Sequence, residues 1–425
     1  MIHSMPLVVP VLILGFLFSC NSSDEPVYDE AEVPSYTLPG LMVTEAGDSV
    51  SGYEVWNNVR KPEILELFSK EMYGHFPDKE YTISFTEKVL SEYYLDSTAT
   101  VKEITGKVRT SSGGEQFTIL YVFPRNTMRV PVFTGLNFSG NHTIDTLGAI
   151  SIHNRWVRNS ERAHISDNHA SPESRGASAS RWPLADIISE GYGVATAYYG
   201  EFDPDYDDGF ENGFHPLFAQ PGKGTETYCP GAISIWAKGM SFLADYLSQD
   251  TVADPSRIIA IGHSRLGKTA LWAGANDARF AAVISNNSGC GGAALSMRRF
   301  GEKVSRINTV FPHWFCDRFN RYNDREHKLP MDQHMLLALM APRPVYVASA
   351  TKDKWADPHG EFLALRAATP VYDLFGYPQE FPETQPAPDK PYHGITGYHI
   401  RSGMHDITTF DWMMYMRWCD QWLVR

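Results

Sequence analysis

Short runs of apolar and β-branched residues recur along the chain and alternate with stretches of helical spacing. Continuous apolar runs are typical of strands buried on both faces, since a half-exposed strand alternates apolar and polar positions. Strands are predicted over residues 81–89, 100–110, 117–123, 131–134, 191–199, 258–261, 281–285 and 344–349, and helices over 62–76, 232–247 and 409–423. This alternation predicts one α/β domain, with a mostly parallel sheet covered by helices on both faces.

The N-terminal stretch is apolar from Pro6 to Phe18 and then reaches Cys20. A membrane-spanning helix needs about 20 apolar residues, so this stretch is better explained as a secretory signal. A cysteine directly after Leu-Phe-Ser is similar to the bacterial lipobox, in which the cysteine receives lipid; an ordinary cleaved signal is the alternative. We expect a lipoprotein-type signal peptide at 1–20, lipidated at Cys20, and therefore export to a bacterial envelope, at the outer membrane or cell surface.

Residues 21–45 are expected to form a flexible tether, because the acidic and polar residues after Cys20 bury little apolar surface. The α/β domain is then expected at 46–425. The net charge of −13 over 425 residues argues against nucleic acid or an anionic membrane surface as a partner, so membrane contact is expected only through the lipid. We expect a monomer.

Five cysteines occur, and their spacing fits no zinc pattern, so no metal site is expected. The four cysteines after Cys20 are either disulfide partners or buried thiols. The sequence does not assign pairs.

The segment 258–271 runs from an apolar strand through Gly262 to Ser264 and then into a helix-forming stretch. A serine at such a turn is exposed on a rigid support, beside helix N-terminal amides that can stabilise an oxyanion. The common pattern is Gly-x-Ser-x-Gly, but here the second glycine, Gly267, comes one position late. Ser264 is a candidate nucleophile for acyl transfer, and the alternative is a serine that only caps the helix.

A serine hydroxyl needs an adjacent base to become a good nucleophile. His405 is the candidate base, because it lies in a glycine-containing turn before the helix at 409–423. His399 is its main competitor.

The acid that orients this base is expected in the loop after the strand at 344–349. Asp353 is the candidate because it lies nearer the end of the strand, whereas Asp357 precedes Pro358 and is the natural cap of a helix beginning there. Serine, acid and then histidine is the chain order of α/β-hydrolases.

Four motifs, taken in order, resemble the glucuronoyl esterases of carbohydrate esterase family 15, and the bacterial branch more than the fungal one. They are Gly-His-Ser-Arg-Leu-Gly-Lys at 262–268, Asn-Ser-Gly-Cys-Gly-Gly at 287–292, Asp-Lys-Trp at 353–355 and Gly-Met-His at 403–405. The resemblance covers residues 50–425. It implies an α/β-hydrolase catalytic domain, a three-layer sandwich with a mostly parallel central sheet. It also implies a serine esterase that cleaves esters of glucuronic or 4-O-methylglucuronic acid on xylan, releases lignin-type alcohols and uses no cofactor.

The resemblance further implies roles for single residues. Ser264 matches the nucleophile and His405 the base, and Arg265 matches an arginine that supports the oxyanion with a permanent cation. Three more residues match positions that contact the uronoyl sugar: Lys268, Glu302 and Trp355. An ammonium donor, a carboxylate acceptor and a flat aromatic face suit a sugar ring.

One departure from the family concerns the acid of the triad. Asn287 stands where many relatives have a glutamate, and an amide cannot carry the charge that stabilises an imidazolium. We therefore expect Asp353 to be the sole acid.

Two alternatives remain open. The first is another enzyme on the same fold, such as an acetyl (xylan) esterase or a peptidase, since a fold does not determine a substrate. The second is a non-catalytic surface lipoprotein that binds glycan with a decayed triad. Asn287 favours this second alternative, and a close approach of Asp353 and His405 would oppose it.

Overall fold

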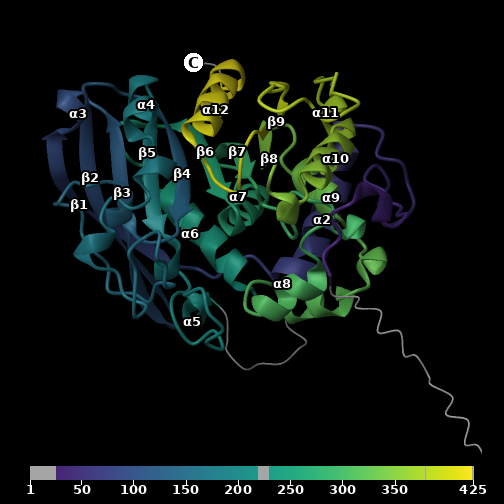
Figure 1. The fold of residues 1–425 in the computed structure, drawn as a ribbon, viewed down its shortest axis with the longest axis horizontal. Coiled ribbons are helices and arrows are strands. Elements are labelled where there is room, and N and C mark those ends of the chain that lie inside the picture. The colour runs from purple at the N-terminus through teal and green to yellow at the C-terminus, as the bar shows by residue number, and fades with distance from the viewer. Residues whose placement is uncertain (1–24, 219–228, 379, 424–425) are drawn as a thin grey trace, which may run out of the picture.

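The computed structural model describes residues 25–218, 229–378 and 380–423 (Figure 1). The predicted signal peptide at 1–20 and the predicted lipidation site, Cys20, lie outside the described residues. Among the described residues, no helix has the length and apolar character needed to cross a bilayer. The described cysteines are all free thiols: Cys229, Cys290, Cys316 and Cys419.

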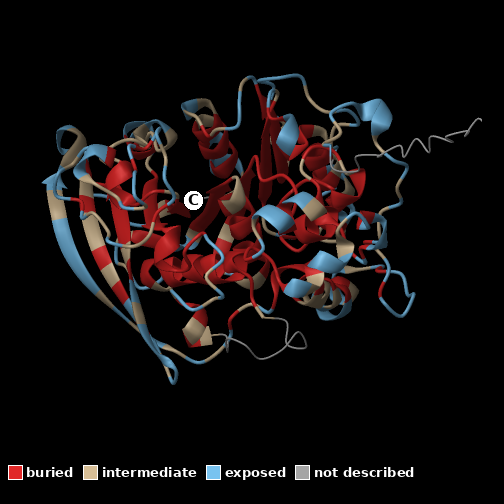
Figure 2. Cartoon of the chain, turned by 60° about the horizontal axis from the view of Figure 1, so that its bottom comes forward, coloured by how far each residue is buried: buried red, intermediate tan, exposed pale blue. Residues whose placement is uncertain are grey.

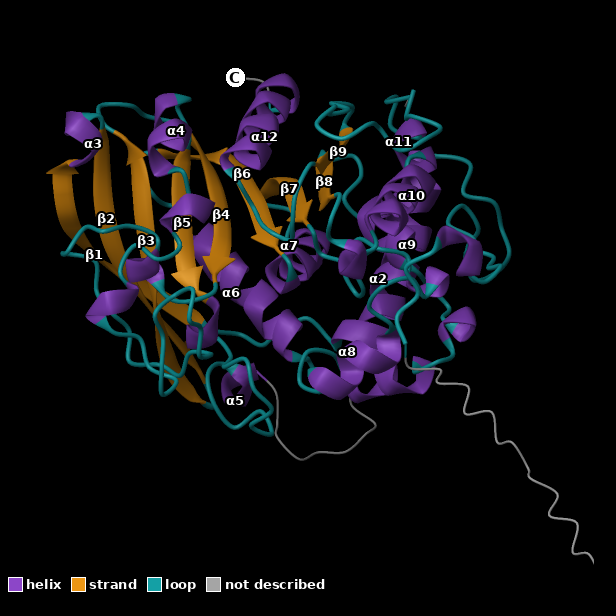
Figure 3. Cartoon of the chain, in the orientation of Figure 1, coloured by secondary structure: helices purple, strands orange, loops and turns teal. Residues whose placement is uncertain are grey.

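Within the described residues, nine strands form one sheet in the order β1-β2-β3-β5-β4-β6-β7-β8-β9 (Figure 3). The pairs β1–β2, β2–β3 and β3–β5 are antiparallel, and every pair from β5 onward is parallel. The strands are β1 (Thr82–Tyr93), β2 (Ala99–Thr110), β3 (Gly113–Pro124), β4 (Val130–Asn137), β5 (Gly193–Tyr198), β6 (Ala253–His263), β7 (Phe280–Asn286), β8 (Val345–Ala350) and β9 (Thr396–Arg401).

The helices cover both faces of this sheet. One face packs against α4 and α12, and the other against α6, α7, α9 and α10. The helices are α1 (Tyr53–Val55), α2 (Lys61–Phe68), α3 (Tyr94–Ser97), α4 (Leu184–Ser189), α5 (His215–Phe218), α6 (Ala232–Leu247), α7 (Arg265–Asn276), α8 (Val304–Val310), α9 (Gln333–Ala338), α10 (Pro358–Ala368), α11 (Pro370–Asp373) and α12 (Thr409–Trp422). The α/β-hydrolase fold, a three-layer sandwich with a mostly parallel sheet, is therefore confirmed.

The apolar runs in the sequence follow from this burial on both faces. In β6, Ile258 and Ala260 join the core beneath α6 and α7, whereas Ile259 and Ile261 join the core beneath α12. Each residue of the run is thus buried on one side or the other. The edge strand β1 has only exposed and half-buried positions, and Figure 2 shows the edge of the sheet mainly in the exposed and intermediate colours.

The predicted elements are present with shifted bounds, but β9 is not among the predictions. It reads Thr-Gly-Tyr-His-Ile-Arg, and its polar residues are buried. His399 and Arg401 both bind Asp411 of α12, so hydrogen bonds take the place of apolar burial in this strand. A search for apolar runs does not find such a strand.

Part of the segment expected as a tether lies on the domain. Val27 pairs with Phe300, and Glu30 forms an ion pair with Arg298 at 2.7 Å. Leu41 belongs to the hydrophobic core. These contacts correct the expectation for residues 27–45, because single apolar residues and one salt bridge hold an otherwise polar segment in place.

The carboxyl ends of the parallel strands lie at one edge of the sheet. In open α/β sheets, ligands bind at this edge, where loops from neighbouring strands meet. Here β6 ends at His263, β8 at Ala350 and β9 at Arg401, each just before a candidate residue of the triad.

Candidate active site

Ser264 lies in the turn between β6 and α7, with φ 58° and ψ −129°. A non-glycine residue in this conformation is strained, and such strain is typical of functional turns. The Ser264 side chain makes no capping hydrogen bond to the helix. The turn therefore presents the hydroxyl instead of using it as a helix cap.

Two glycines allow this turn to form. A Cβ atom at Gly262 would lie 1.9 Å from the Leu266 carbonyl oxygen. A Cβ atom at Gly267 would lie 3.0 Å from Ser288 Cβ, because α7 passes close to the turn after β7. The second glycine is therefore needed at 267, one position later than in the common pattern.

His405 and Asp353 are hydrogen-bonded, with 2.5 Å between Nδ1 and Oδ2. The His405 ring lies 4.6 Å from the ring of His263, the residue before Ser264. Three segments that are distant in the sequence thus meet beside the Ser264 turn. Among the described residues the Ser264 hydroxyl forms no hydrogen bond; in unliganded enzymes the serine–histidine hydrogen bond is commonly long and tightens with substrate.

Asp353 is buried, with 5% of its surface exposed. Burial alone raises the pKa of a carboxyl group, but hydrogen bonds from His405 and Asn287 outweigh it here and lower the pKa of Asp353 below its ordinary value. The carboxylate is therefore ionised and can stabilise an imidazolium at His405.

Asn287 supports this carboxylate. Its Nδ2 donates to Asp353 Oδ2 at 2.9 Å, and its backbone lies at φ 48°. A second carboxylate at this position would repel Asp353, whereas an amide donates a hydrogen bond to it. The departure from the family at Asn287 thus fits a site with one acid.

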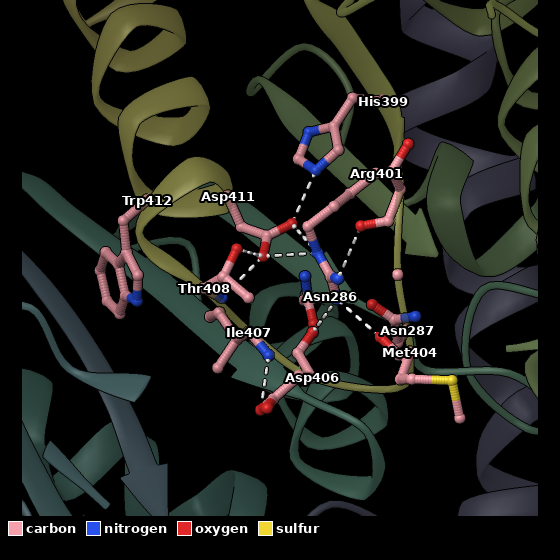
Figure 4. A network of polar contacts seen from close by, with 12 residues as sticks. Asn286, Asn287, His399, Arg401, Met404, Asp406, Ile407, Thr408, Asp411 and Trp412 are labelled. Atoms are coloured by element: carbon pink, nitrogen blue, oxygen red, sulfur yellow. Dashed lines mark hydrogen bonds and ion pairs between the residues drawn. The ribbon is translucent and has the colours of Figure 1, made fainter. Parts of the chain in front are cut away.

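Arg401 holds the backbone on both sides of His405 (Figure 4). Its Nη2 donates to the carbonyls of Met404 and Asp406, each at 2.8 Å, and its Nε pairs with Asp411 at 3.0 Å. His399 binds the same Asp411 at 2.8 Å. The competitor histidine therefore belongs to the support of the loop, and it does not contact Asp353.

Two hydrogen bonds tie the histidine loop to the acid loop. Lys352 N donates to Gly403 O at 2.9 Å, and Gly403 N donates to Thr351 Oγ1 at 3.1 Å. Asp357 lies farther along the acid loop, where it accepts the Gly360 amide at 2.9 Å and pairs with Arg298 at 2.8 Å. Asp357 is thus the cap of α10, as the following proline suggested.

Arg265 follows Ser264, is half-buried and forms an ion pair with the fully buried Asp205. Burial disfavours the charged guanidinium, but Asp205 outweighs it and raises the pKa of Arg265. The guanidinium also lies 4.9 Å from the centroid of the Trp314 ring. A permanent cation is therefore held beside the nucleophile.

Asp205, which is not among the residues predicted for the site, is the centre of the polar contacts around Arg265. Beyond Arg265 it accepts hydrogen bonds from Tyr199 at 2.9 Å, His313 at 3.0 Å and Trp314 at 2.7 Å. Burial raises the pKa of Asp205, but Arg265 and these donors outweigh burial and lower it well below the ordinary range. The signal available in the sequence is the pair of aspartates at 203 and 205, which follows within a few residues of the strand predicted at 191–199.

Lys268, Glu302 and Trp355 gather on one side of the turn. Lys268 is buried and donates from Nζ to Ser288 O at 2.6 Å, while burial lowers its pKa and the charge of Glu302 opposes this effect. Glu302 N donates to Trp355 O at 2.9 Å. Trp355 is 39% exposed, a large exposure for a tryptophan.

Comparison with known proteins identifies the family. A curated carbohydrate esterase from an unknown prokaryotic organism is 47% identical over 399 residues, which is 92% of this chain and 91% of that protein. A solved structure of a family 15 esterase is 46% identical and covers 94% of this chain. The chain belongs to carbohydrate esterase family 15. It is a carboxylic ester hydrolase, and residues 214–376 match the family model described as glucuronyl esterase of fungi.

Solved structures agree with this assignment. A promiscuous family 15 esterase from a marine bacterial metagenome superimposes with a TM-score of 0.87 and 46% identity, over 94% of this chain and 100% of that chain. A glucuronoyl esterase from Solibacter usitatus superimposes with a TM-score of 0.85 and is 41% identical. The match covers 92% of this chain and 99% of that chain.

The first prediction concerns the acid. Asp353→Asn is expected to lower the kcat of this esterase by about 100- to 10,000-fold, because the amide cannot stabilise the imidazolium. Asp357→Asn is the matched control, with kcat within about threefold and a loss of stability of about 3–5 kcal/mol, because the substitution breaks a buried ion pair with Arg298. Steady-state kinetics and thermal unfolding measure both effects. An equal loss of kcat in the two variants would contradict the assignment.

A second prediction concerns Arg401 as a positioning residue. Arg401→Gln is expected to lower kcat about 10- to 100-fold with little change in KM, because the loop that holds His405 loses its support. Arg366→Gln removes an arginine that donates to the Glu383 carbonyl at 2.6 Å and serves as the control. Kinetics on a soluble glucuronate ester measure the effect, and an unchanged kcat in Arg401→Gln would refute this role.

Proposed function

We propose that this esterase hydrolyses esters of glucuronic acid or 4-O-methylglucuronic acid on xylan and releases lignin-type alcohols. One observation carries the proposal. A strained serine turn beside a His405–Asp353 pair lies next to a buried ammonium, a carboxylate and an exposed tryptophan. The first group of residues suits acyl transfer, and the second suits an acidic sugar.

The proposed reaction has two halves. Ser264 Oγ attacks the ester carbonyl while His405 Nε2 accepts its proton, and Asp353 stabilises the imidazolium through Nδ1. His405 then protonates the departing alcohol, which leaves a glucuronoyl ester on Ser264. Water attacks this ester with His405 again as the base, and the free acid and the serine are restored.

Charge develops on the carbonyl oxygen in each half-reaction. The cation of Arg265 is held next to Ser264 by its ion pair with Asp205, so it needs no reorganisation when the charge forms. A fixed positive charge in a partly buried site stabilises the oxyanion more than it stabilises the neutral ester. Arg265 therefore acts mainly on the transition state.

The uronoyl sugar is proposed to bind between Lys268, Glu302 and Trp355. Lys268 Nζ is directed at Ser288 O and has further protons to donate to sugar hydroxyls. Glu302 accepts hydrogen bonds from ring hydroxyls, and Trp355 covers one face of the ring. This set distinguishes the substrate from a simple acetyl ester, which has no ring to contact.

The alternative of a decayed, non-catalytic site has less support. Asn287 was the feature in its favour, yet its side chain donates to Asp353, which in turn contacts His405 at 2.5 Å. The proposal also includes lipid attachment at Cys20 in a bacterial envelope. That part is supported only by the sequence of residues 1–20.

The proposed function predicts that Ser264→Ala loses turnover of benzyl glucuronate. The loss should approach the uncatalysed rate, because no acyl-enzyme can form. Binding of free glucuronate should persist in this variant, because the proposed contacts with the sugar come from Lys268, Glu302 and Trp355. Chromatography of the released benzyl alcohol measures turnover, and calorimetry measures binding of glucuronate. Undiminished turnover in Ser264→Ala would contradict the esterase proposal.

The sugar contacts generate a separate prediction. Lys268→Met is expected to lower kcat/KM for benzyl glucuronate about 10- to 100-fold, because a charged hydrogen bond to the sugar is lost. Activity on p-nitrophenyl acetate should change much less. Lys61→Met is the matched control, a partly buried lysine whose pKa burial lowers to about 8 and whose Nζ lies 3.4 Å from the Ala341 carbonyl. Parallel losses on both esters in Lys268→Met would show that Lys268 does not select the sugar.

A further inference from the structure

A second polar cavity lies at the same edge of the sheet as Ser264. It has a volume of about 500 Å³, which lies within the range of small-molecule sites, about 300–1,000 Å³. Its lining comes from the start of β3, the loops after β4 and the end of β5: Gln116, Thr118, Asn141, Ser151, Ile152, His153, Asn154, Arg155, Tyr198 and Glu201. None of the proposed catalytic or uronate-binding residues is among them.

The position of the cavity follows from the sheet order. β5 is parallel to β4 and β4 to β6, so Tyr198 at the end of β5 lies at the same edge as His263 at the end of β6. β3 runs antiparallel to β5, which brings its first residues to this edge as well. The cavity and the nucleophile are therefore separated by the end of a single strand, β4.

Glu201 is the unusual group in this cavity. It is 7% exposed, its Oε2 accepts the Thr118 amide at 2.9 Å, and it has no ion-pair partner among the described residues. Burial raises its pKa to about 7. Hydrogen bonds from Thr118 and the charge of Arg155 oppose this effect, but Arg155 forms no ion pair with Glu201. A buried carboxyl group without a direct ion pair is costly and is seldom retained for packing alone. Its exposure to a cavity indicates that it serves a ligand.

The other groups in the cavity limit the charge of that ligand. Arg155 lines the cavity and pairs with Glu115 at 2.8 Å, so a cation would meet repulsion from its guanidinium. Glu201 disfavours an anion in the same way. His153 stacks on Tyr198 with 4.2 Å between ring centroids, and burial lowers its pKa and keeps it neutral.

Two amide side chains remain available for hydrogen bonds. Gln116 and Asn154 are exposed, line the cavity and form no side-chain hydrogen bonds within the described part of the chain. Amides, a carboxyl group and a guanidinium together offer both donors and acceptors, which is what the hydroxyl groups of a neutral sugar require.

We infer that this cavity is an accessory site for neutral sugar units of the polysaccharide substrate, such as unesterified xylose residues of xylan. This inference rests on the proposed function for the identity of the polysaccharide. In this site, the hydroxyl groups of the sugar ring would be bound by Glu201, Asn154 and Gln116. A sugar bound here retains the polymer at the active edge, so the effect is on binding of long substrates and not on the chemistry at Ser264.

Xylotriose, which carries no uronate and no ester, is the probe for this site. Saturation-transfer NMR or calorimetry with the wild-type chain should detect binding. Asn154→Ala and Gln116→Ala should each weaken binding by about fivefold, the effect of one hydrogen bond. Both side chains are exposed, so folding should be preserved. Gln249→Ala, which removes an exposed amide beyond α6, is the matched control and should leave binding unchanged.

Kinetics separate this site from the proposed esterase chemistry. Asn154→Ala should keep the wild-type kcat and KM on benzyl glucuronate and raise KM for esterified glucuronoxylan fragments. Absence of xylotriose binding to the wild type would overturn the inference, as would binding that is unaffected by Asn154→Ala and Gln116→Ala or that is abolished by Trp355→Ala. These outcomes leave the Ser264→Ala test intact, because xylotriose does not report on ester cleavage.

Discussion

The buried carboxylate of Asp353 is the group on which the proposed active site depends. It lies just beyond β8, accepts hydrogen bonds from His405 and Asn287, and remains ionised although burial opposes its charge. An imidazole that accepts a proton from serine needs this negative charge, because the imidazolium is otherwise unstable in a partly buried site. The strained serine turn and the histidine loop are useful only in combination with it.

Ion pairs between an arginine and a buried aspartate position the loops that carry the site. Arg265 pairs with Asp205 beside the serine turn, and Arg401 pairs with Asp411 beneath the histidine loop. Buried ion pairs add little net stability, but breaking one is strongly destabilising. Their contribution here is geometric, because each pair holds a loop backbone in one arrangement at the carboxyl edge of the sheet.

The sequence alone was enough to predict the sandwich and the serine turn, since apolar runs and helical spacing report burial directly. The strand β9 was not predictable, because its polar residues are buried through hydrogen bonds to α12. The role of Asp205 was hidden because its partners Arg265, His313 and Trp314 are distant in the sequence, and the role of Arg401 was hidden because it acts on backbone carbonyls, which no residue pattern reports. The position of Asp353 nearer the end of its strand, and the proline after Asp357, pointed to Asp353 as the acid, and the contacts of the two residues agree with that choice. The packing of residues 27–45 on the domain depends on a few contacts that composition does not reveal.

The central claim is that Ser264, His405 and Asp353 act together to make one serine hydroxyl nucleophilic. The most direct measurement is the rate at which a fluorophosphonate reagent labels the intact protein, with the modified residue located by peptide mass spectrometry. The account predicts a single adduct on Ser264 in the wild-type chain and labelling slowed by at least about 100-fold in both His405→Ala and Asp353→Asn. Labelling at another residue, or equal rates in the three proteins, would contradict it.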